Sequence, residues 1–145
     1  RINEVTLITK SCLYCSSSVN EGNAWQPKTK PVRQETIHMD YFFMTEALES
    51  DLSGYHYREK GCFMFGDDED EIVKCAQSFY MFGIDLAQPY FFISGDGYMG
   101  LGLGTGGGND TVSFSTLDQM VEHKLIDQKM FGIYTRNSND GDVPS

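Results

Sequence analysis

The pair Cys12 and Cys15, separated by two residues, is a feature of this sequence that could carry chemistry. Two cysteines at this spacing can form a redox pair or supply half of a metal site. The chain has no second pair of this spacing and lacks the alternation of strands and helices that surrounds such redox pairs. The pattern therefore favours a structural disulfide.

Other groups that could bind ions or phosphate lack the spacing that such sites need. The acidic run Asp67 to Glu71 has neither the alternation nor the glycine of an EF-hand loop, which indicates a solvated hairpin tip. The glycine-rich stretch 102–108 does not end in the Lys-Ser/Thr of a phosphate-binding loop. The chain's three histidines, His38, His56 and His123, are scattered without ligand spacing. We expect no metal site and no cofactor.

The elements that must position these residues are mostly strands. A period of two, or a short apolar run between turn residues, predicts strands at 2–9, 36–44, 61–66, 72–82, 91–94 and 130–135. One helix is predicted from Ser115 to Lys124, because Ser115 can cap it, Asp118 follows three residues later, and apolar residues recur at helical spacing. Segments 100–110 and 137–145 are expected to be a loop and a polar tail. The fold class is therefore all-β.

The hairpin predicted around the acidic run places Cys62 and Cys75 at similar distances from its tip. Four cysteines allow three pairings, and the sequence alone does not choose among them. The hairpin favours Cys62 with Cys75, which leaves Cys12 with Cys15.

Composition excludes several classes of function. The 145 residues (16.3 kDa) suffice for one domain with a core, and the formal net charge is −10. An acidic chain is a poor ligand for nucleic acid or anionic lipid, and no apolar run approaches the length of a membrane span. The cysteines, together with the acceptor triplet at Asn109, predict a glycosylated protein that is secreted or lies in a vesicular or lysosomal lumen.

One stretch resembles a known family. Residues 95–102 contain the motif Asp96-Gly97-Tyr98-Met99-Gly100, followed by a glycine-rich loop, the helix 117–126 and the apolar segment 130–134. This order and spacing are similar to the end of the N-terminal lobe of pepsin-like aspartic peptidases, over about 40 residues. The resemblance implies a pepsin-like lobe, a partly open barrel or sandwich with one or two short helices, and a structural role for Asp96.

Other segments fit the same family more loosely. Phe82-Gly83 is similar to the strand that precedes the motif, and the resemblance makes 41–54 the flap that covers the family's cleft, beginning with Tyr41, Phe42 and Phe43. This flap is several residues longer than the family's and has no internal glycine. The resemblance also implies that residues 1–145 form an N-terminal lobe that is incomplete at its start and lacks its C-terminal lobe. We therefore expect a second lobe or a second chain as partner.

The catalytic triplet of the family is degenerate here. Aligned on the first strand and the following cysteines, Ile8, Thr9 and Lys10 stand where the family has Asp-Thr-Gly. The family's mechanism needs two carboxylates that share a proton, and isoleucine can neither accept a proton nor orient water. None of the other aspartates, including Asp51 and Asp85, lies in a catalytic sequence context.

Three hypotheses about function follow from this pattern. The first is a catalytically inactive homologue, a pseudo-peptidase that binds peptide or protein in a cleft. The second is an active aspartic endopeptidase whose site is completed by a missing segment or a second chain. The third is a structural or antigenic secreted protein with a closed cleft.

Overall fold

A computed structural model of the chain describes residues 4–9, 24–43, 46–66, 70–88, 96–102 and 113–135, with side chains outside 39–50 and 86–88. These residues are mostly β, which confirms the predicted all-β class. They form the strands β1 (Val5–Ile8), β2 (Arg33–Phe43), β3 (Glu46–Phe65), β4 (Ile72–Gln88) and β5 (Gly97–Met99) and the helix α1 (Thr116–Glu122). The predicted strand 91–94 lies outside the described residues.

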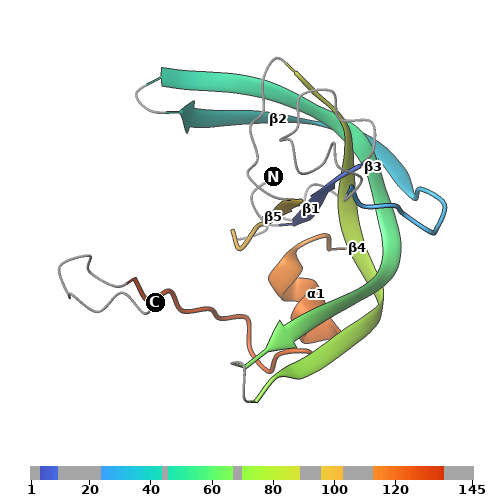
Figure 1. Ribbon diagram of the computed structural model, residues 1–145, viewed down its shortest axis with the longest axis vertical. Coiled ribbons are helices and arrows are strands. Elements are labelled where there is room, and N and C mark those ends of the chain that lie inside the picture. Colours follow the sequence, from blue (N-terminus) through green and yellow to red (C-terminus); the bar gives the residue numbers. More distant parts are fainter. Residues whose placement is uncertain are drawn as a thin grey trace.

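The strands form one sheet in the order β2-β3-β4-β1-β5. Strands β2, β3 and β4 follow one another as antiparallel hairpins, whereas β1 pairs in parallel with β4 and antiparallel with β5. The long strands β3 and β4 curve strongly, and α1 lies on their concave side (Figure 1). The first strand of the chain thus lies between two much later ones.

Strands β3 and β4 are longer than the sequence predicted. The predicted strand 61–66 is only the end of β3, which starts at Glu46, and β4 continues past the predicted end at Phe82. The charged stretch Arg58 to Lys60 hides the period of two within β3. Irregular register near Ser53 and near Glu59 gives two places where the hairpin can bend.

The hairpin of β3 and β4 is joined by a disulfide. Cys62 and Cys75 are direct cross-strand neighbours in the ladder and are bonded to each other, as the sequence predicted. Cys12 and Cys15 lie outside the described residues. The bond joins two strands near the acidic tip, where the exposed Met64 and Val73 supply little buried apolar area.

Replacing both Cys62 and Cys75 with serine is expected to lower the free energy of unfolding by about 3 kcal/mol, because the bond closes a loop in the unfolded chain. The sequence separation of 13 sets this magnitude. Urea unfolding of the double variant measures the loss without reducing any other cysteine. An unchanged midpoint would show that the bond contributes nothing to stability.

The helix confirms its predicted start. The Asp118 amide donates to the Ser115 hydroxyl, which makes Ser115 the N-cap. A hydrogen bond from Lys129 holds the pKa of the Asp118 carboxyl below its usual value. The helix ends at Glu122 because Lys124 adopts a left-handed conformation, with φ of 57°.

The helix C-terminus is closed by backbone hydrogen bonds. The Leu125 amide donates to the Met120 carbonyl at 2.8 Å, and the Lys124 amide donates to the Val121 carbonyl at 3.0 Å. This is the pattern of a Schellman motif, in which the left-handed residue is usually glycine. The turn directs Leu125 back into the core, where it is 4 % exposed.

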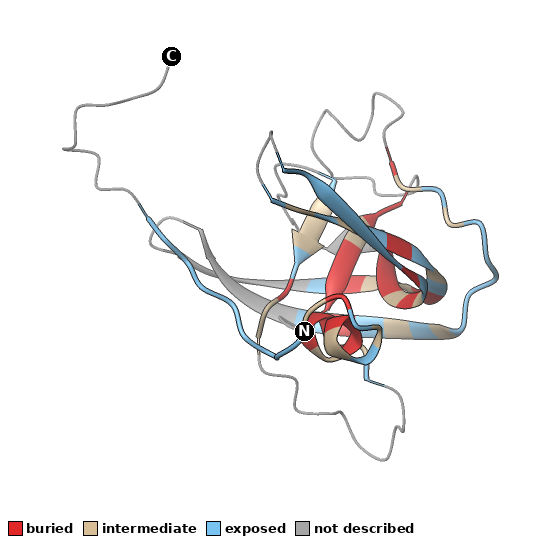
Figure 2. Cartoon of the chain, turned by 90° about the horizontal axis from the view of Figure 1, so that it is seen from below, coloured by how far each residue is buried: buried red, intermediate tan, exposed pale blue. Residues whose placement is uncertain are grey.

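The core lies between the sheet and α1. Buried residues follow β1, the middle of β4 and the inner face of the helix (Figure 2). The main cluster consists of Val5, Ala76, Phe79, Met81, Leu117, Met120 and Leu125. Of the four apolar residues at helical spacing in the sequence, Leu117, Met120 and Leu125 are in this cluster, whereas Val121 is only partly buried and lies outside it.

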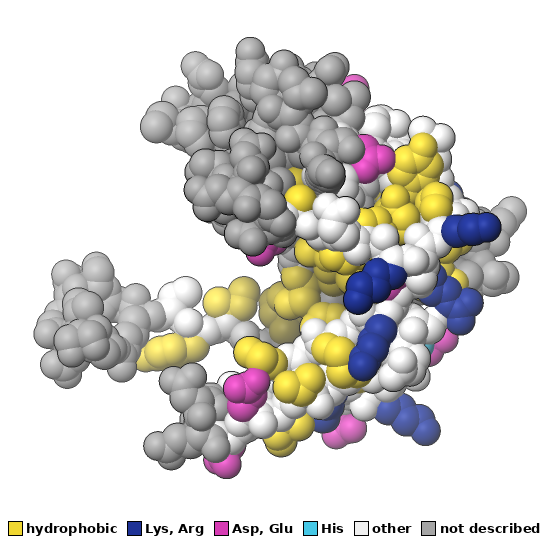
Figure 3. Space-filling model, turned by 45° about the vertical axis from the view of Figure 1, so that its right-hand side comes forward, with side chains coloured by type: hydrophobic (Ala, Val, Ile, Leu, Met, Phe, Trp, Pro, Cys, Tyr) yellow, Lys and Arg dark blue, Asp and Glu magenta, His cyan; other side chains and the backbone are white. Residues whose placement is uncertain are grey.

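The predicted strand 130–135 is wrong. These residues carry no strand, and they form no ladder with any strand that the structure describes. Met130, Ile133 and Tyr134 are at least 70 % exposed, and the segment extends away from the sheet (Figures 1 and 3). A period of two shows that a segment is suited to a strand, but the segment becomes a strand only when it forms hydrogen bonds with a neighbouring backbone.

Among the described residues, no helix is long and apolar enough to cross a membrane.

Candidate functional site

Ile8, which the sequence analysis aligned with a catalytic aspartate, lies at the end of β1, deep in the sheet. Ile8 is fully buried, its amide donates to the Asp96 carbonyl at 2.9 Å, and its carbonyl accepts from the Trp25 amide at 3.0 Å. Its side chain therefore has a packing role, and its backbone is bonded on both sides. Lys10 lies outside the described residues.

Thr9 contacts a carboxylate that the sequence analysis gave no chemical role. Its hydroxyl lies 2.6 Å from Asp85 Oδ1 and 2.7 Å from the Ile84 carbonyl, and its amide donates to that carbonyl at 3.1 Å. Asp85 is on β4, 76 residues further along the chain, and reaches Thr9 because β1 and β4 run in parallel. An acidic residue two positions after Gly83 was the only local signal, because alternate strand residues share a face.

Two aromatic side chains cover the same place. A Cβ built on Gly83 would lie 2.9 Å from Thr9 Cγ2, 3.1 Å from Tyr57 Cε2 and 3.2 Å from Trp25 Cζ3. The Trp25 and Tyr57 rings meet edge to face, with centroids 5.4 Å apart. Thr9, Trp25 and Tyr57 thus converge over a glycine that leaves room for them.

The charges near Tyr57 are negative. Burial raises the pKa of the Tyr57 phenol, and the charges of Asp85, Tyr55 and Glu59 raise it further. Glu59 accepts hydrogen bonds from the amide and the hydroxyl of Thr29, which secures the loop before β2. The site therefore combines a neutral phenol with carboxylates.

The motif 96–100 lies on the other side of β1. Gly97, Tyr98 and Met99 form β5 and pair with Leu7, Thr6 and Val5. The amide of Gly100 donates to the Glu4 carbonyl at 2.9 Å. A Cβ on Gly97 would lie 2.1 Å from the Thr6 carbonyl oxygen, so only glycine permits this close approach.

The predicted flap is a β-hairpin in its backbone. Tyr41 pairs with Leu48, Phe42 with Ala47, and Phe43 with Glu46. The side chains of these residues lie outside the described part of the structure. Asn109 also lies outside it.

A comparison with known proteins finds no family model, no curated protein and no solved structure that this chain matches.

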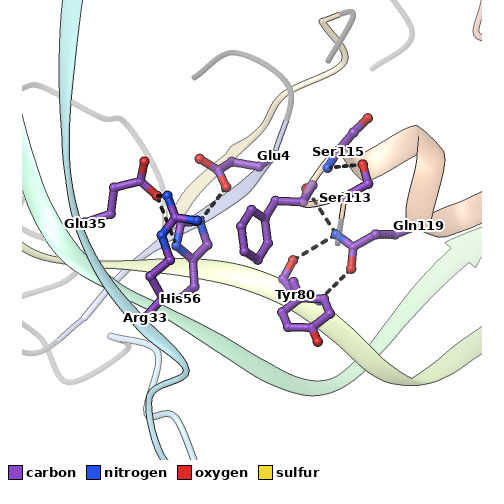
Figure 4. Close-up of polar contacts among 9 residues, drawn as sticks. Glu4, Arg33, Glu35, His56, Tyr80, Ser113, Ser115 and Gln119 are labelled. Carbon is purple, nitrogen blue, oxygen red and sulfur yellow. Dashed lines mark hydrogen bonds and ion pairs between the residues drawn. The ribbon is translucent and has the colours of Figure 1, made fainter. Parts of the chain in front are cut away.

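A second cluster of polar residues lies around the buried pair of Glu4 and His56 (Figure 4). His56 Nε2 lies 2.8 Å from Glu4 Oε2, and these side chains are 0 % and 1 % exposed. His56 Nδ1 and Arg33 Nη2 each lie 3.5 Å from Glu35 Oε2, and Phe114 stacks on the imidazole at 4.2 Å. The lack of ligand spacing in the sequence favours a surface or satisfied role for each histidine, and His56 is of the second kind, because it is buried and lies within hydrogen-bond distance of Glu4. Glu4 and His56 thus form an interior contact between the residue that precedes β1 and strand β3.

Gln119 joins the helix to the sheet (Figure 4). Its Oε1 accepts from the Tyr80 amide at 2.6 Å, and its Nε2 lies 3.1 Å from the carbonyl oxygens of Tyr80 and Phe114. Strand β1 pairs with β4 only from Phe82 to Ile84. Gln119 bonds the β4 backbone at Tyr80, just outside this paired stretch. At this edge of β4, a helix side chain makes the backbone hydrogen bonds that a neighbouring strand would otherwise make.

A polar pocket of about 230 Å³ opens beside this contact. Arg58, Glu122 and His123 line it, together with Tyr80. Because the wall of this pocket carries groups of both charges, the pocket favours neither an anionic nor a cationic ligand. Among the described residues, no group of three His, Cys, Asp or Glu side chains is placed to hold a metal ion.

Proposed function

We propose that the chain is a catalytically inactive relative of the pepsin-like aspartic peptidases, which binds a peptide or protein segment in a cleft without cleaving it. The pairing of three distant segments carries the proposal. The resemblance singles out the triplet strand, the strand with Phe82-Gly83, and the motif 96–100. These segments lie side by side, with Thr6 opposite both Phe82 and Tyr98. If the three short similarities were coincidental, there would be no reason for these segments to lie side by side in the sheet.

The absence of catalysis rests on Ile8. Aspartic peptidases use two carboxylates that share a proton and position a water molecule. At the family's first carboxylate position this chain has a buried aliphatic side chain, which offers no group to the water. The adjacent Thr9 hydroxyl is engaged with Ile84 and Asp85. The site keeps a framework for binding and lacks the acid–base pair.

The setting of this function is secreted or luminal. The disulfide of Cys62 and Cys75 fits an oxidising compartment. Glycosylation at Asn109 and a second lobe, or a second chain, as the other wall of the cleft complete the proposal.

The test is incubation with a defined mixture of peptides at acid pH, followed by mass spectrometry of the bound and unbound fractions. We expect all peptides to stay intact and a subset to remain bound. Cleavage that pepstatin inhibits would overturn the proposal. Retention of no peptide by the chain, alone or with any co-purifying partner, would overturn the binding role.

One observation favours a second candidate, an active aspartic endopeptidase. Asp85 brings a carboxylate to within 2.6 Å of the Thr9 hydroxyl, beside the position of the lost aspartate. In this alternative, a missing segment or a second chain supplies the other carboxylate. Pepstatin-sensitive cleavage that is lost in Asp85→Asn and kept in Glu71→Gln, which changes an exposed carboxylate at the β3–β4 hairpin tip, would establish it.

A further inference from the structure

The carboxylate of Asp85 has no cationic partner among the residues that the structure describes. Its carboxylate accepts a hydrogen bond from the Thr9 hydroxyl, and no Lys, Arg or His among the described residues lies within ion-pair distance of it. Asp85 is partly buried at the end of the β1–β4 pairing. A partly desolvated carboxylate is stabilised when a cation joins it. The Asp85 carboxylate is therefore suited to pair with a cationic group of a ligand.

Aromatic rings lie against the threonine that holds this carboxylate. Trp25, Tyr57 and the methyl group of Thr9 converge over Gly83, while the hydroxyl of the same Thr9 bonds Asp85. The edge-to-face contact of the two rings fixes their orientation. A cation that reaches the Asp85 carboxylate would also lie against aromatic rings, which attract ammonium and guanidinium groups.

The other charges near Tyr57 and over the whole chain are negative, like that of Asp85. The negative charges of Asp85 and Glu59 both raise the pKa of the Tyr57 phenol. One oxygen of Glu59, Oε1, receives the hydrogen bonds of the loop at Thr29. The chain as a whole carries a formal charge of −10, which draws cationic ligands toward it.

We propose that Asp85, Trp25 and Tyr57 form a subsite that binds the side chain of an arginine or lysine in a peptide. The inference rests on the proposed function and names the ligand class that this part of the cleft selects. The carboxylate pairs with the cationic group, the rings cover its apolar stem and its face, and the Thr9 hydroxyl holds the carboxylate in position. Arginine suits the subsite better than lysine, because its planar guanidinium can stack on a ring while it binds a carboxylate.

Trp25 makes the test direct, because it is the only tryptophan of the chain. Its fluorescence is titrated with acetyl-Gly-Arg-Gly-amide and with the matched peptide in which citrulline replaces arginine. Citrulline has nearly the same shape and no charge. We expect the arginine peptide to bind at least about tenfold more tightly, as for a charge-assisted hydrogen bond. Asp85→Asn should remove that preference, whereas Glu71→Gln should keep it.

The outcomes separate this inference from the proposed function. Equal affinity for the two peptides in the wild-type chain overturns the subsite and leaves a peptide-binding cleft in place. No response of Trp25 to either peptide also overturns the subsite, and the peptide-mixture experiment then decides on the cleft. A preference that survives in Asp85→Asn assigns the selectivity to another carboxylate and overturns the role of Asp85. If Asp85→Asn unfolds, the wild-type comparison of arginine with citrulline still decides.

Discussion

Replacing Gln119 with leucine is expected to lower the free energy of unfolding by about 3 kcal/mol. The side chain is 1 % exposed, and its amide satisfies the amide and carbonyl of Tyr80 and the carbonyl of Phe114. Leucine fills a similar volume and leaves all three groups without a partner. A buried polar group that loses its partner costs about 1–3 kcal/mol, and relaxation toward the nearby pocket offsets part of the sum.

Urea unfolding measures this loss, and hydrogen exchange locates it. The Tyr80 amide should exchange much faster in the variant than in the wild-type chain, while amides paired within β3 and β4 keep their relative protection. Gln128→Leu is the matched control, because Gln128 is exposed and no side-chain contact of it is recorded among the described residues. Gln119→Glu keeps the acceptor for the Tyr80 amide but sets a buried carboxylate oxygen against the Tyr80 and Phe114 carbonyls, so it should destabilise the fold at least as much as Gln119→Leu. Equal stability of Gln119→Leu and Gln128→Leu would show that the contact is not needed.

The parts of the fold that the sequence predicted correctly depend on local chemistry. Ser115 and Asp118 identify the helix start through a capping pattern three residues long. The acidic tip and two equidistant cysteines identify the β3–β4 hairpin and its disulfide. In each case the residues that determine the structure are close together in the chain.

The candidate site was less predictable because its residues come from distant segments. Thr9, Trp25 and Tyr57 meet over Gly83 only when β1 inserts between β4 and β5. Nothing in the residues next to Asp85 indicates that β1 will lie beside it, so the sequence analysis dismissed this carboxylate. The opposite error occurred at 130–135, where a local pattern predicted a strand that has no partner among the described residues.

The same limit applies to the buried charges. The sequence analysis treated the three histidines alike, because none of them has the spacing of a ligand set. Register decides between them, since Arg33 pairs with His56 and Glu35 with Gly54, which places Arg33, Glu35 and His56 on one face of the sheet. His38 lies on the opposite face and is exposed, paired there with Asp51.

Removing Glu4 is expected to destabilise the fold clearly. Glu4→Leu leaves His56 fully buried without its 2.8 Å partner, and a buried polar group that loses its partner costs about 1–3 kcal/mol. Glu4→Gln keeps a hydrogen-bonding group of the same shape and should lose less. His56→Phe should also destabilise the fold, because it leaves the Glu4 carboxylate without a partner in the same apolar surroundings, which include Phe82 and Phe114.

The double variant Glu4→Leu/His56→Phe distinguishes the pair from the packing around it. When both polar partners are removed, neither remains buried alone, so the double variant should lose clearly less stability than the sum of the two single variants. Urea unfolding of the four proteins of this cycle gives the coupling energy, which we expect to exceed about 1 kcal/mol.

The exposed pair of His38 and Asp51 provides the comparison within the same molecule. Its Nδ1–Oδ1 distance is 2.7 Å, close to that of the buried pair, but its side chains are 56 % and 62 % exposed. The corresponding cycle with His38→Ala and Asp51→Ala should give a coupling below about 1 kcal/mol, because water solvates either partner when the other is lost. Equal coupling in the two cycles would mean that distance alone sets the strength of these pairs. A larger coupling at His56 would show that burial does, since burial removes the water that could replace the missing partner.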